Sequence, residues 1–167
     1  VEDNEFQVKE NLTLVCNQLK LKKLINLNQI HSSKVFVVNN KDDHIHDIKA
    51  DGLVTKLNDI GLSILGADCA PILFYDNISK VIGACHAGWR GAINGIIENT
   101  VASMENIGAN RNNIISIIGP TIQKISYEIK NDLAQIVKES EFYKNNHSIL
   151  FHVKQDKYLL DLPLLLK

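Results

Sequence analysis

The spacing of apolar residues predicts three helices around a β-rich centre. An amphipathic helix is expected over residues 4–20, with Cys16 on its buried stripe. A second helix is expected to begin in the Gly-Trp-Arg-Gly segment at 88–91 and to end at 108–110. A third is expected from an N-cap at Asn131 to Ser140. Its inward-facing residues would be Leu133, Ile136 and Val137.

Short apolar runs bounded by turn residues predict the strands. They are residues 24–29, 34–38, 51–55, 62–65, 72–75, 81–84, 114–118, 149–153 and 158–160. The run at 114–118 is expected to be a buried strand. Helices and strands do not alternate regularly, so the expected fold class is α+β, with mixed α/β layers. A length of 167 residues predicts one domain.

Composition narrows the class of protein. With 45% hydrophobic and 22% charged residues, the chain resembles an ordinary soluble domain. Its apolar runs are too short for a membrane span. A net charge of −1 without a long basic run argues against a nucleic-acid partner. Three widely spaced cysteines and no visible signal peptide predict a reducing, cytoplasmic location.

Two local features of the polar residues matter for chemistry. Only Arg90 and Arg111 are arginines among 18 basic residues, so an arginine at a motif position stands out. His44 and His46 form a His-x-His pair, but they fall in a polar loop at residues 39–47. Metal binding by that pair is not expected.

A predicted β-hairpin brings a cysteine and a histidine together. If Asn77 and Ile78 form its tip, the numbers of paired residues sum to 155, and Cys69 lies opposite His86. Opposed Cβ atoms in such a ladder are ~4.5–5.5 Å apart. A thiolate and an imidazole at that separation can reach the same metal ion or the same proton.

The residues around this hairpin favour a functional site over a buried Cys–His pair. Asp68 lies in an apolar stretch, where a buried carboxylate needs a partner. Arg90 lies where the Gly-Trp-Arg-Gly segment opens a helix, a setting that suits an anion. His31 is available as a third ligand. Cys85 is expected on the opposite face of its strand from His86, so no fourth protein ligand is evident.

Two histidines, one cysteine and an open position match catalytic zinc. The same ligands match a blue-copper centre if a weak axial ligand is added. The only methionine, Met104, is expected on a core stripe, and six histidines are too few for a multicopper oxidase. The spacing therefore favours zinc over copper.

Five motifs in order resemble a known family. They are Asn-Gln-Ile-His (28–31), Ala-Asp-Gly-Leu-Val-Thr (50–55), Gly-Ala-Asp-Cys-Ala-Pro (66–71), His-Ala-Gly-Trp-Arg-Gly (86–91) and Ile-Gly-Pro with Ser-Tyr-Glu (118–128). The chain resembles the laccase-domain, or peptidoglycan-editing-factor, family of polyphenol oxidoreductases. Members are mostly described as purine nucleoside phosphorylases with adenosine deaminase activity. The resemblance implies a fold similar to the catalytic domain of cytotoxic necrotizing factor.

The resemblance also implies roles for individual residues. The zinc ligands would be His31, Cys69 and His86. The residues that bind substrate or phosphate would be Gly88, Trp89, Arg90, Gly91, Tyr127 and Glu128. The chain departs from the family pattern at Ser32, Thr121, Gln123 and Lys130. Members extend further at both ends, so the chain is expected to be a fragment.

The leading hypothesis is a zinc-dependent purine nucleoside phosphorylase with adenosine deaminase activity. Its substrates would be phosphate and nucleosides such as adenosine, inosine, guanosine and methylthioadenosine. Asp68, if burial raises its pKa, would protonate the departing base, and Glu128 is a second candidate acid.

Three other hypotheses stay open. One is a copper-dependent polyphenol oxidase. Another is a metal-free hydrolase or amidase acting on peptidoglycan precursors, with Cys69 as nucleophile and His86 as base. The third is a non-enzymatic structural zinc or interaction domain, which would need a fourth protein ligand to close a structural zinc site. The sequence leaves the oligomeric state undetermined.

Overall fold

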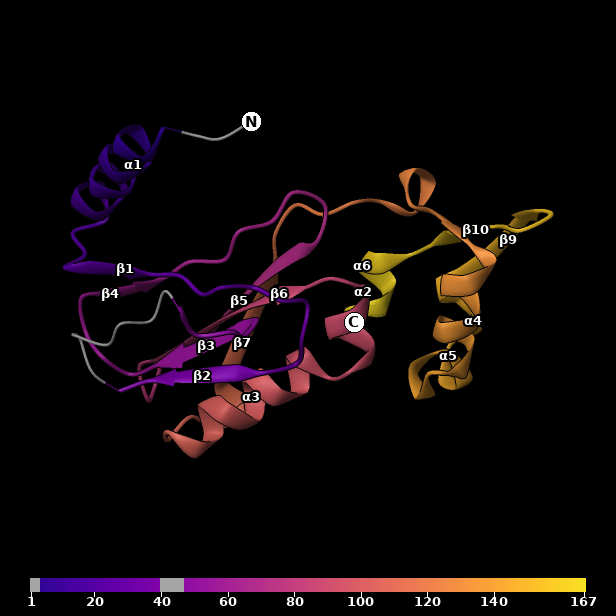
Figure 1. The fold of residues 1–167 in the computed structure, drawn as a ribbon. Coiled ribbons are helices and arrows are strands. Elements are labelled where there is room, and N and C mark those ends of the chain that lie inside the picture. The colour runs from indigo at the N-terminus through magenta and orange to yellow at the C-terminus, as the bar shows by residue number, and fades with distance from the viewer. Residues whose placement is uncertain (1–3, 40–46) are drawn as a thin grey trace.

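The computed structural model describes residues 4–39 and 47–167. His44 and His46 lie outside the described residues. A central five-stranded sheet dominates the fold (Figure 1). Its strands, in spatial order, are β2 (Val35–Val38), β3 (Gly52–Thr55), β6 (Val81–Ala87), β5 (Ala70–Asp76) and β7 (Ile114–Ile118). The β2–β3 pair is parallel and the other pairs are antiparallel.

One face of the central sheet is covered by helix α3 (Ile96–Asn106). Its buried residues are Ile96, Thr100 and Met104. Two glycines of the sheet permit the close approach. A Cβ at Gly83 would lie 2.9 Å from the Met104 sulfur, and one at Gly52 would lie 3.1 Å from the Thr100 hydroxyl. A side chain at either position would require Met104 or Thr100 to shift, so glycine favours this close packing of the helix on the sheet.

The single helix expected from the Gly-Trp-Arg-Gly segment is in fact two. α2 (Trp89–Ile93) ends at Ile93 with Asn94 as its C-cap, and α3 begins after Gly95, which has a φ of 81°. This left-handed conformation, easily adopted by glycine, breaks the helical hydrogen-bond pattern. The predicted end of the helix near Gly108, which has a φ of 108°, is confirmed.

The β5–β6 hairpin forms as predicted, but its register differs. Paired residues sum to 157, so Pro71 lies opposite His86 and Asp76 opposite Val81. The reason is a four-residue loop, Asn77 to Lys80, in which Lys80 has a φ of 59°. Since the shift is by two residues, every side chain keeps its predicted face of the sheet.

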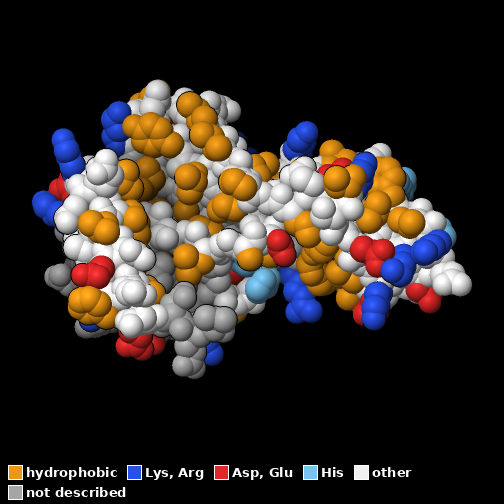
Figure 2. All heavy atoms as spheres, turned by 90° about the horizontal axis from the view of Figure 1, so that it is seen from above, with side chains coloured by type: hydrophobic (Ala, Val, Ile, Leu, Met, Phe, Trp, Pro, Cys, Tyr) orange, Lys and Arg blue, Asp and Glu red, His pale blue; other side chains and the backbone are white. Residues whose placement is uncertain are grey.

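The strand β7 was expected to be buried, and this is wrong. Among the described strands it pairs with β5 alone and so lies at the edge of the sheet, and Ile115 and Ile117 are 60% and 65% exposed. On β5, Leu73 and Tyr75 lie opposite them and are exposed too. These four side chains line an apolar groove on the sheet face opposite α3. Figure 2, a view from above, shows hydrophobic side chains at the surface of both the left and the right parts of the molecule.

Helix α1 (Glu5–Gln18) begins where predicted, because the Asn4 side chain accepts hydrogen bonds from the Phe6 and Gln7 amides. The expectation that Cys16 lies in the core is wrong, since α1 has no buried residue and Cys16 is only partly covered. The helix stands beside a small parallel pair, β1 (Lys23–Ile25) and β4 (Ile60–Leu62) (Figure 1).

The strand predicted at residues 62–65 ends at Leu62 instead. The physical reason is that the Gln29 side chain, and not a neighbouring strand, forms the hydrogen bonds with the backbone of Leu65. The Gln29 amide donates to the Leu65 carbonyl at 2.7 Å and accepts from the Leu65 N–H at 2.8 Å. Residues 63–66 therefore form an irregular segment tied to Gln29.

The C-terminal part forms a three-stranded antiparallel sheet with three helices (Figure 1). Its elements are β8 (Glu128–Lys130), α4 (Asn131–Glu139), α5 (Glu141–Asn145), β9 (Leu150–Lys154), β10 (Lys157–Leu160) and α6 (Leu162–Leu165). In α4, Val137 is buried as predicted, but Ile136 is 48% exposed. The N-cap is Lys130, without a side-chain cap, and not Asn131. The buried residues of this part share one hydrophobic cluster with the central sheet.

The predicted α+β class is confirmed. Helix α3 lies on the central sheet, and α4 contacts the C-terminal sheet. No helix among residues 4–39 and 47–167 has the length and apolar character that crossing a bilayer requires.

Asp76 makes folding stability depend on pH at the hairpin loop. Its carboxylate is fully buried and accepts from the backbone N–H groups of Asn110, Ile78 and Ser79. The hydrogen bond from Asn110 lowers the pKa of Asp76 most; burial opposes it, the other amides add to it, and the result is about 2. A lowered pKa in the folded state stabilises the fold above the unfolded-state value of about 4, and this contribution is lost as the pH falls toward 2.

We therefore expect Asp76→Asn to lower Tm at neutral pH, because an amide NH₂ would face backbone N–H donors. The difference in Tm between wild type and variant should shrink as the pH falls from about 4 to about 2. Thermal unfolding followed by circular dichroism at several pH values measures it. A difference that stays constant down to pH 2 would contradict this role of Asp76.

Candidate functional site

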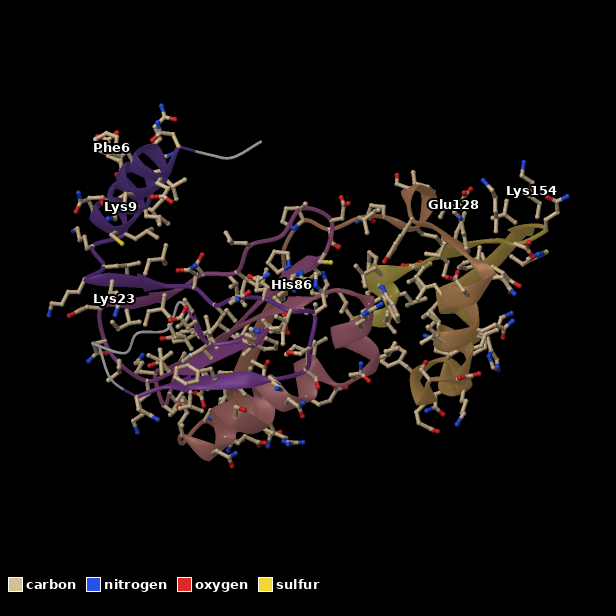
Figure 3. The ribbon with its side chains drawn as sticks, in the orientation of Figure 1. Phe6, Lys9, Lys23, His86, Glu128 and Lys154 are labelled. Atoms are coloured by element: carbon tan, nitrogen blue, oxygen red, sulfur yellow. The ribbon has the colours of Figure 1, made fainter. Side chains whose placement is uncertain are left out.

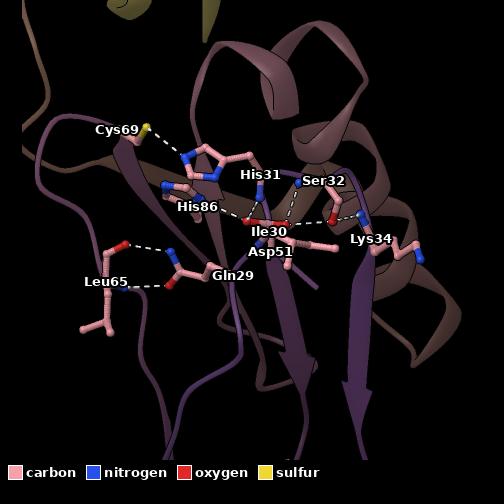
Figure 4. A network of polar contacts seen from close by, with 9 residues as sticks. All are labelled: Gln29, Ile30, His31, Ser32, Lys34, Asp51, Leu65, Cys69 and His86. Carbon is pink, nitrogen blue, oxygen red and sulfur yellow. Dashed lines mark hydrogen bonds and ion pairs between the residues drawn. The ribbon is translucent and has the colours of Figure 1, made fainter. Parts of the chain in front are cut away.

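A buried carboxylate organises the candidate site (Figure 4). Asp51 immediately precedes β3 and has no exposed surface. It accepts hydrogen bonds from the backbone N–H groups of Ile30, His31 and Ser32 at 3.2, 2.9 and 2.6 Å. The Ser32 hydroxyl adds a fourth at 2.7 Å, and the His86 ring Nδ1 lies 3.0 Å away.

The turn around His31 has an uncommon backbone conformation. His31 has a φ of 58°, in the left-handed region that non-glycine residues seldom adopt. Consecutive N–H groups that converge on one point form a nest for an anion. Here the anion is the Asp51 carboxylate, so the turn and the carboxylate hold each other in place.

His86 lies in β6 and is only 4% exposed. When Nδ1 donates its hydrogen to Asp51, Nε2 carries a lone pair on the opposite side of the ring. The His31 ring meets the His86 ring edge-on, with centroids 4.8 Å apart and an interplanar angle of 77°. The two imidazole rings are therefore in contact with each other and lie at the same place in the fold.

Cys69 completes the group from the segment just before β5. Its sulfur lies 4.0 Å from His31 Nε2, and one ligand atom each of His31, Cys69 and His86 lie within 4.8 Å of one another. Gly88 is needed here, because a Cβ at that position would be 2.8 Å from the Cys69 sulfur and 3.3 Å from the His31 ring. The three residues predicted as ligands are thus brought together, although not by the predicted register.

The chemistry of this donor set fits a metal ion. Two imidazole nitrogens and one sulfur are ligands that zinc and copper both accept. A tetrahedral ion with bonds of about 2.0–2.3 Å holds its ligands ~3.5 Å apart. The three ligand atoms, which lie within 4.8 Å of one another, would need to approach by about an ångström, and neither His31 nor Cys69 is buried. Cys85 belongs to no such group among the described residues and is fully buried.

The three residues line an open cleft of about 770 Å³. Its other lining residues are Leu27, Asn28, Gln29, Leu65, Gly66, Ala67 and Asp68. The wall at residues 65–69 is fixed at both ends. Gln29 holds Leu65, and the Asp68 carbonyl accepts from the Ile122 N–H at 2.9 Å and the Thr121 hydroxyl at 2.7 Å.

Asp68 was expected to be buried, and this is wrong: the residue is exposed on the cleft wall. The apolar neighbours in the sequence do not cover it, because residues 63–69 form a surface segment between β4 and β5. Its side chain therefore faces water and any molecule that enters the cleft.

The pKa values in the site shift for identifiable reasons. Burial by itself raises the pKa of Asp51, but the hydrogen bonds from His86, Ser32 and Ile30 outweigh it and leave the pKa lowered. Burial raises the pKa of the Cys69 thiol, and the nearby carboxylates of Asp68 and Asp51 raise it further. Burial also raises the pKa of Tyr127, with added effects from Cys69 and Asp68.

None of the remaining predicted residues, Gly88 to Gly91, Tyr127 and Glu128, is among the described residues that line the cleft, and they differ in exposure. Arg90 is exposed, and its guanidinium stacks on the Trp89 ring at 5.0 Å. Tyr127 is partly buried, and it is close enough to Cys69 and Asp68 for their charges to raise its pKa. Glu128, in β8, is exposed and forms an ion pair of 2.6 Å with Lys157. Figure 3 shows Glu128 on the C-terminal part of the molecule, away from His86.

Sequence analysis missed Asp51 as a site residue, although its motif was noted. Asp51 follows Ala50 and immediately precedes an apolar strand, where a carboxylate is unusual. A charge in such a place needs hydrogen-bond partners, and this requirement was the signal in the sequence. The partners of Asp51 lie about 20 residues before it and 35 residues after it. Only the folded sheet brings them together.

Comparison with known proteins identifies relatives of this chain. The family model described as multi-copper polyphenol oxidoreductase laccase matches residues 1–167. Purine nucleoside phosphorylase RP494 of Rickettsia prowazekii is 36% identical over 166 residues, which cover 96% of this chain and 65% of the relative. Purine nucleoside phosphorylase Cj1217c of Campylobacter jejuni is 32% identical over 169 residues, covering 98% and 69%.

Solved structures share the fold. The Neisseria meningitidis protein NMB0706 superposes with a TM-score of 0.83 at 30% identity, covering 99% of this chain and 65% of that one. The hypothetical protein YfiH of Bacillus licheniformis gives a TM-score of 0.84 at 26% identity, with coverage of 99% and 65%. The chain thus spans about two thirds of the length of these relatives.

Proposed function

The chain belongs to the multi-copper polyphenol oxidoreductase laccase family, as its motifs predicted, and on that premise we propose that it carries the metal centre of a zinc-dependent purine nucleoside phosphorylase. Relatives that match nearly its whole length are named purine nucleoside phosphorylases. Its substrates are then a purine nucleoside and phosphate. Deamination of adenosine at the same centre, with water as nucleophile, is part of the proposal.

The observation that carries the proposal is the convergence of His31, Cys69 and His86 on the wall of an open cleft. A catalytic zinc ion has three protein ligands and leaves one position for water or substrate. A structural zinc ion has four protein ligands, and the described residues offer only these three in one group. The arrangement therefore supports a catalytic centre.

The protein's own groups supply the rest of the chemistry. Zinc bound at this site would act as a Lewis acid toward substrate or water. In phosphorolysis a phosphate oxygen forms a bond to the sugar C1′ while the bond from C1′ to the purine nitrogen breaks. The departing purine takes a proton, and we assign its donation to Asp68, which is exposed in the cleft beside Cys69.

The phosphate needs a cation, and we assign this role to Arg90. Its guanidinium lies against the Trp89 ring at the start of α2. Arg90 follows Gly88 by two residues, and a Cβ at Gly88 would meet both Cys69 and His31. A planar guanidinium can bind two phosphate oxygens at once. Tyr127, partly buried near Cys69 and Asp68, is assigned to the nucleoside-binding wall.

Two alternatives agree less well with the structure. A blue-copper centre needs a weak axial ligand, which is often methionine. The only methionine, Met104 of α3, is fully buried beside Gly83 of β6 and is not part of the site. A metal-free cysteine nucleophile needs a lowered thiol pKa, whereas burial and two carboxylates raise the pKa of Cys69. Metal binding removes this difficulty, because the ion itself stabilises the thiolate.

The test of the proposal is metal content together with phosphate-dependent activity. Purified protein should hold about one zinc ion per chain and release free base from inosine or adenosine only with phosphate present. Cys69→Ser should lose the zinc and at least 100-fold of the activity. Cys16→Ser, on the exposed helix α1, serves as control and should change neither. Copper in place of zinc, or cleavage that does not depend on phosphate, would contradict the proposal.

Arg90→Lys keeps the charge but loses the planar fork that binds phosphate. We expect the KM for phosphate to rise about tenfold or more, with zinc content and the KM for nucleoside unchanged. Arg111→Lys is the matched control, since the other arginine forms a surface ion pair with Glu105. An unchanged phosphate KM in Arg90→Lys would remove this residue from phosphate binding.

Asp68→Asn should retain full zinc occupancy and lose one limb of the pH–rate profile, with turnover reduced about 100-fold or more. The reason is that the amide cannot donate a proton to the departing purine. Glu128→Gln tests the second candidate acid and should leave the profile unchanged, because Glu128 is engaged with Lys157. If Glu128→Gln shows the loss and Asp68→Asn does not, the two assignments must be exchanged.

A further inference from the structure

We infer that Asp51 is the positioning residue for both histidine ligands, acting on His86 through its ring and on His31 through the main chain. This inference rests on the metal centre of the proposed function. It adds that one carboxylate, which does not touch the metal or the substrate, controls the affinity of the whole centre for its metal ion.

The contact with His86 sets which ring nitrogen faces the metal site. Asp51 Oδ1 lies 3.0 Å from Nδ1, and both side chains are almost fully buried. A carboxylate only accepts hydrogen bonds, so it selects the tautomer with hydrogen on Nδ1 and a lone pair on Nε2. Only that tautomer can bind a metal ion through Nε2.

The contacts with residues 30–32 set where the His31 ring lies. The φ of 58° at His31 turns its side chain toward Cys69, whose sulfur is 4.0 Å from Nε2. This conformation is unfavourable for a residue with a Cβ. Three consecutive N–H groups converge on Asp51 when His31 adopts it, and the carboxylate therefore stabilises the conformation that the ligand requires.

The two actions cannot be separated, because they use the same two oxygens. Oδ1 accepts from the His31 N–H and faces the His86 ring, while Oδ2 accepts from Ile30 and Ser32. With no exposed surface, Asp51 has no water to replace a lost partner. An asparagine would place an NH₂ group against N–H donors, or donate to Nδ1 and select the wrong tautomer of His86.

The experiment measures metal affinity with Co²⁺ alone, whose absorption bands report bonding to the Cys69 sulfur. Asp51→Asn should bind Co²⁺ about 10- to 100-fold more weakly than wild type. Asp76→Asn is the matched control: its carboxylate is equally buried and also accepts backbone N–H groups, but it lies at the far end of β5. It should lower Tm and leave the Co²⁺ affinity unchanged.

A second measurement is independent of metal. Nitrogen NMR of the histidine rings in the metal-free protein should show hydrogen on Nδ1 of His86 in wild type and a shift toward the other tautomer in Asp51→Asn. If that variant does not fold, Ser32→Ala removes one hydrogen bond to Oδ2. It should weaken Co²⁺ binding several-fold through the His31 turn, with the His86 tautomer unchanged.

Unchanged Co²⁺ affinity in folded Asp51→Asn, or in Ser32→Ala if it alone folds, would overturn the inference. Equal weakening by Asp76→Asn would do so too, because the effect would then be one of general stability. If wild type binds neither Co²⁺ nor Zn²⁺, the proposed function fails. An unchanged His86 tautomer in metal-free Asp51→Asn overturns the inference separately.

Discussion

Asp51 is a buried carboxylate placed where three parts of the fold meet. It immediately precedes β3, it accepts the amides of the turn before β2, and it faces the ring of His86 on β6. A buried charge is unfavourable without hydrogen-bond partners, and four donors besides the ring satisfy this one. The turn at residues 30–32, the start of β3 and the His86 ring therefore have to assemble together. Their assembly places His31 and His86 next to each other.

The central sheet supplies the third ligand by a different route. Cys69 lies just before β5 and Gly88 just after β6, so the hairpin ladder places them next to each other. Any side chain at position 88 would meet the Cys69 sulfur and the His31 ring. The glycine of the Gly-Trp-Arg-Gly segment thus has a steric role at the metal site as well as a place at the start of α2.

Stability and chemistry are divided between the two ends of β5. At one end, Asp76 ties the hairpin loop to the segment after α3 through the Asn110 amide. At the other end, Cys69 and Asp68 face the cleft. The two buried carboxylates, Asp51 and Asp76, use the same physical device of converging backbone N–H groups. One of them stabilises a loop, whereas the other, by our inference, also orients ligands.

The sequence by itself determined the α+β class, most of the strands, and the identity of His31, Cys69 and His86 as one group. Hairpin spacing carries that information for Cys69 and His86, and the motif that resembles the family carries it for His31. Only the tertiary structure decided the hairpin register, the break at Gly95, the exposure of Asp68 and β7, and the role of Asp51. These features depend on loop conformation, on which sheet face a helix covers, and on partners up to 35 residues away. Local patterns of hydrophobicity do not encode such partners, because a buried charge is satisfied by whatever the fold brings to it.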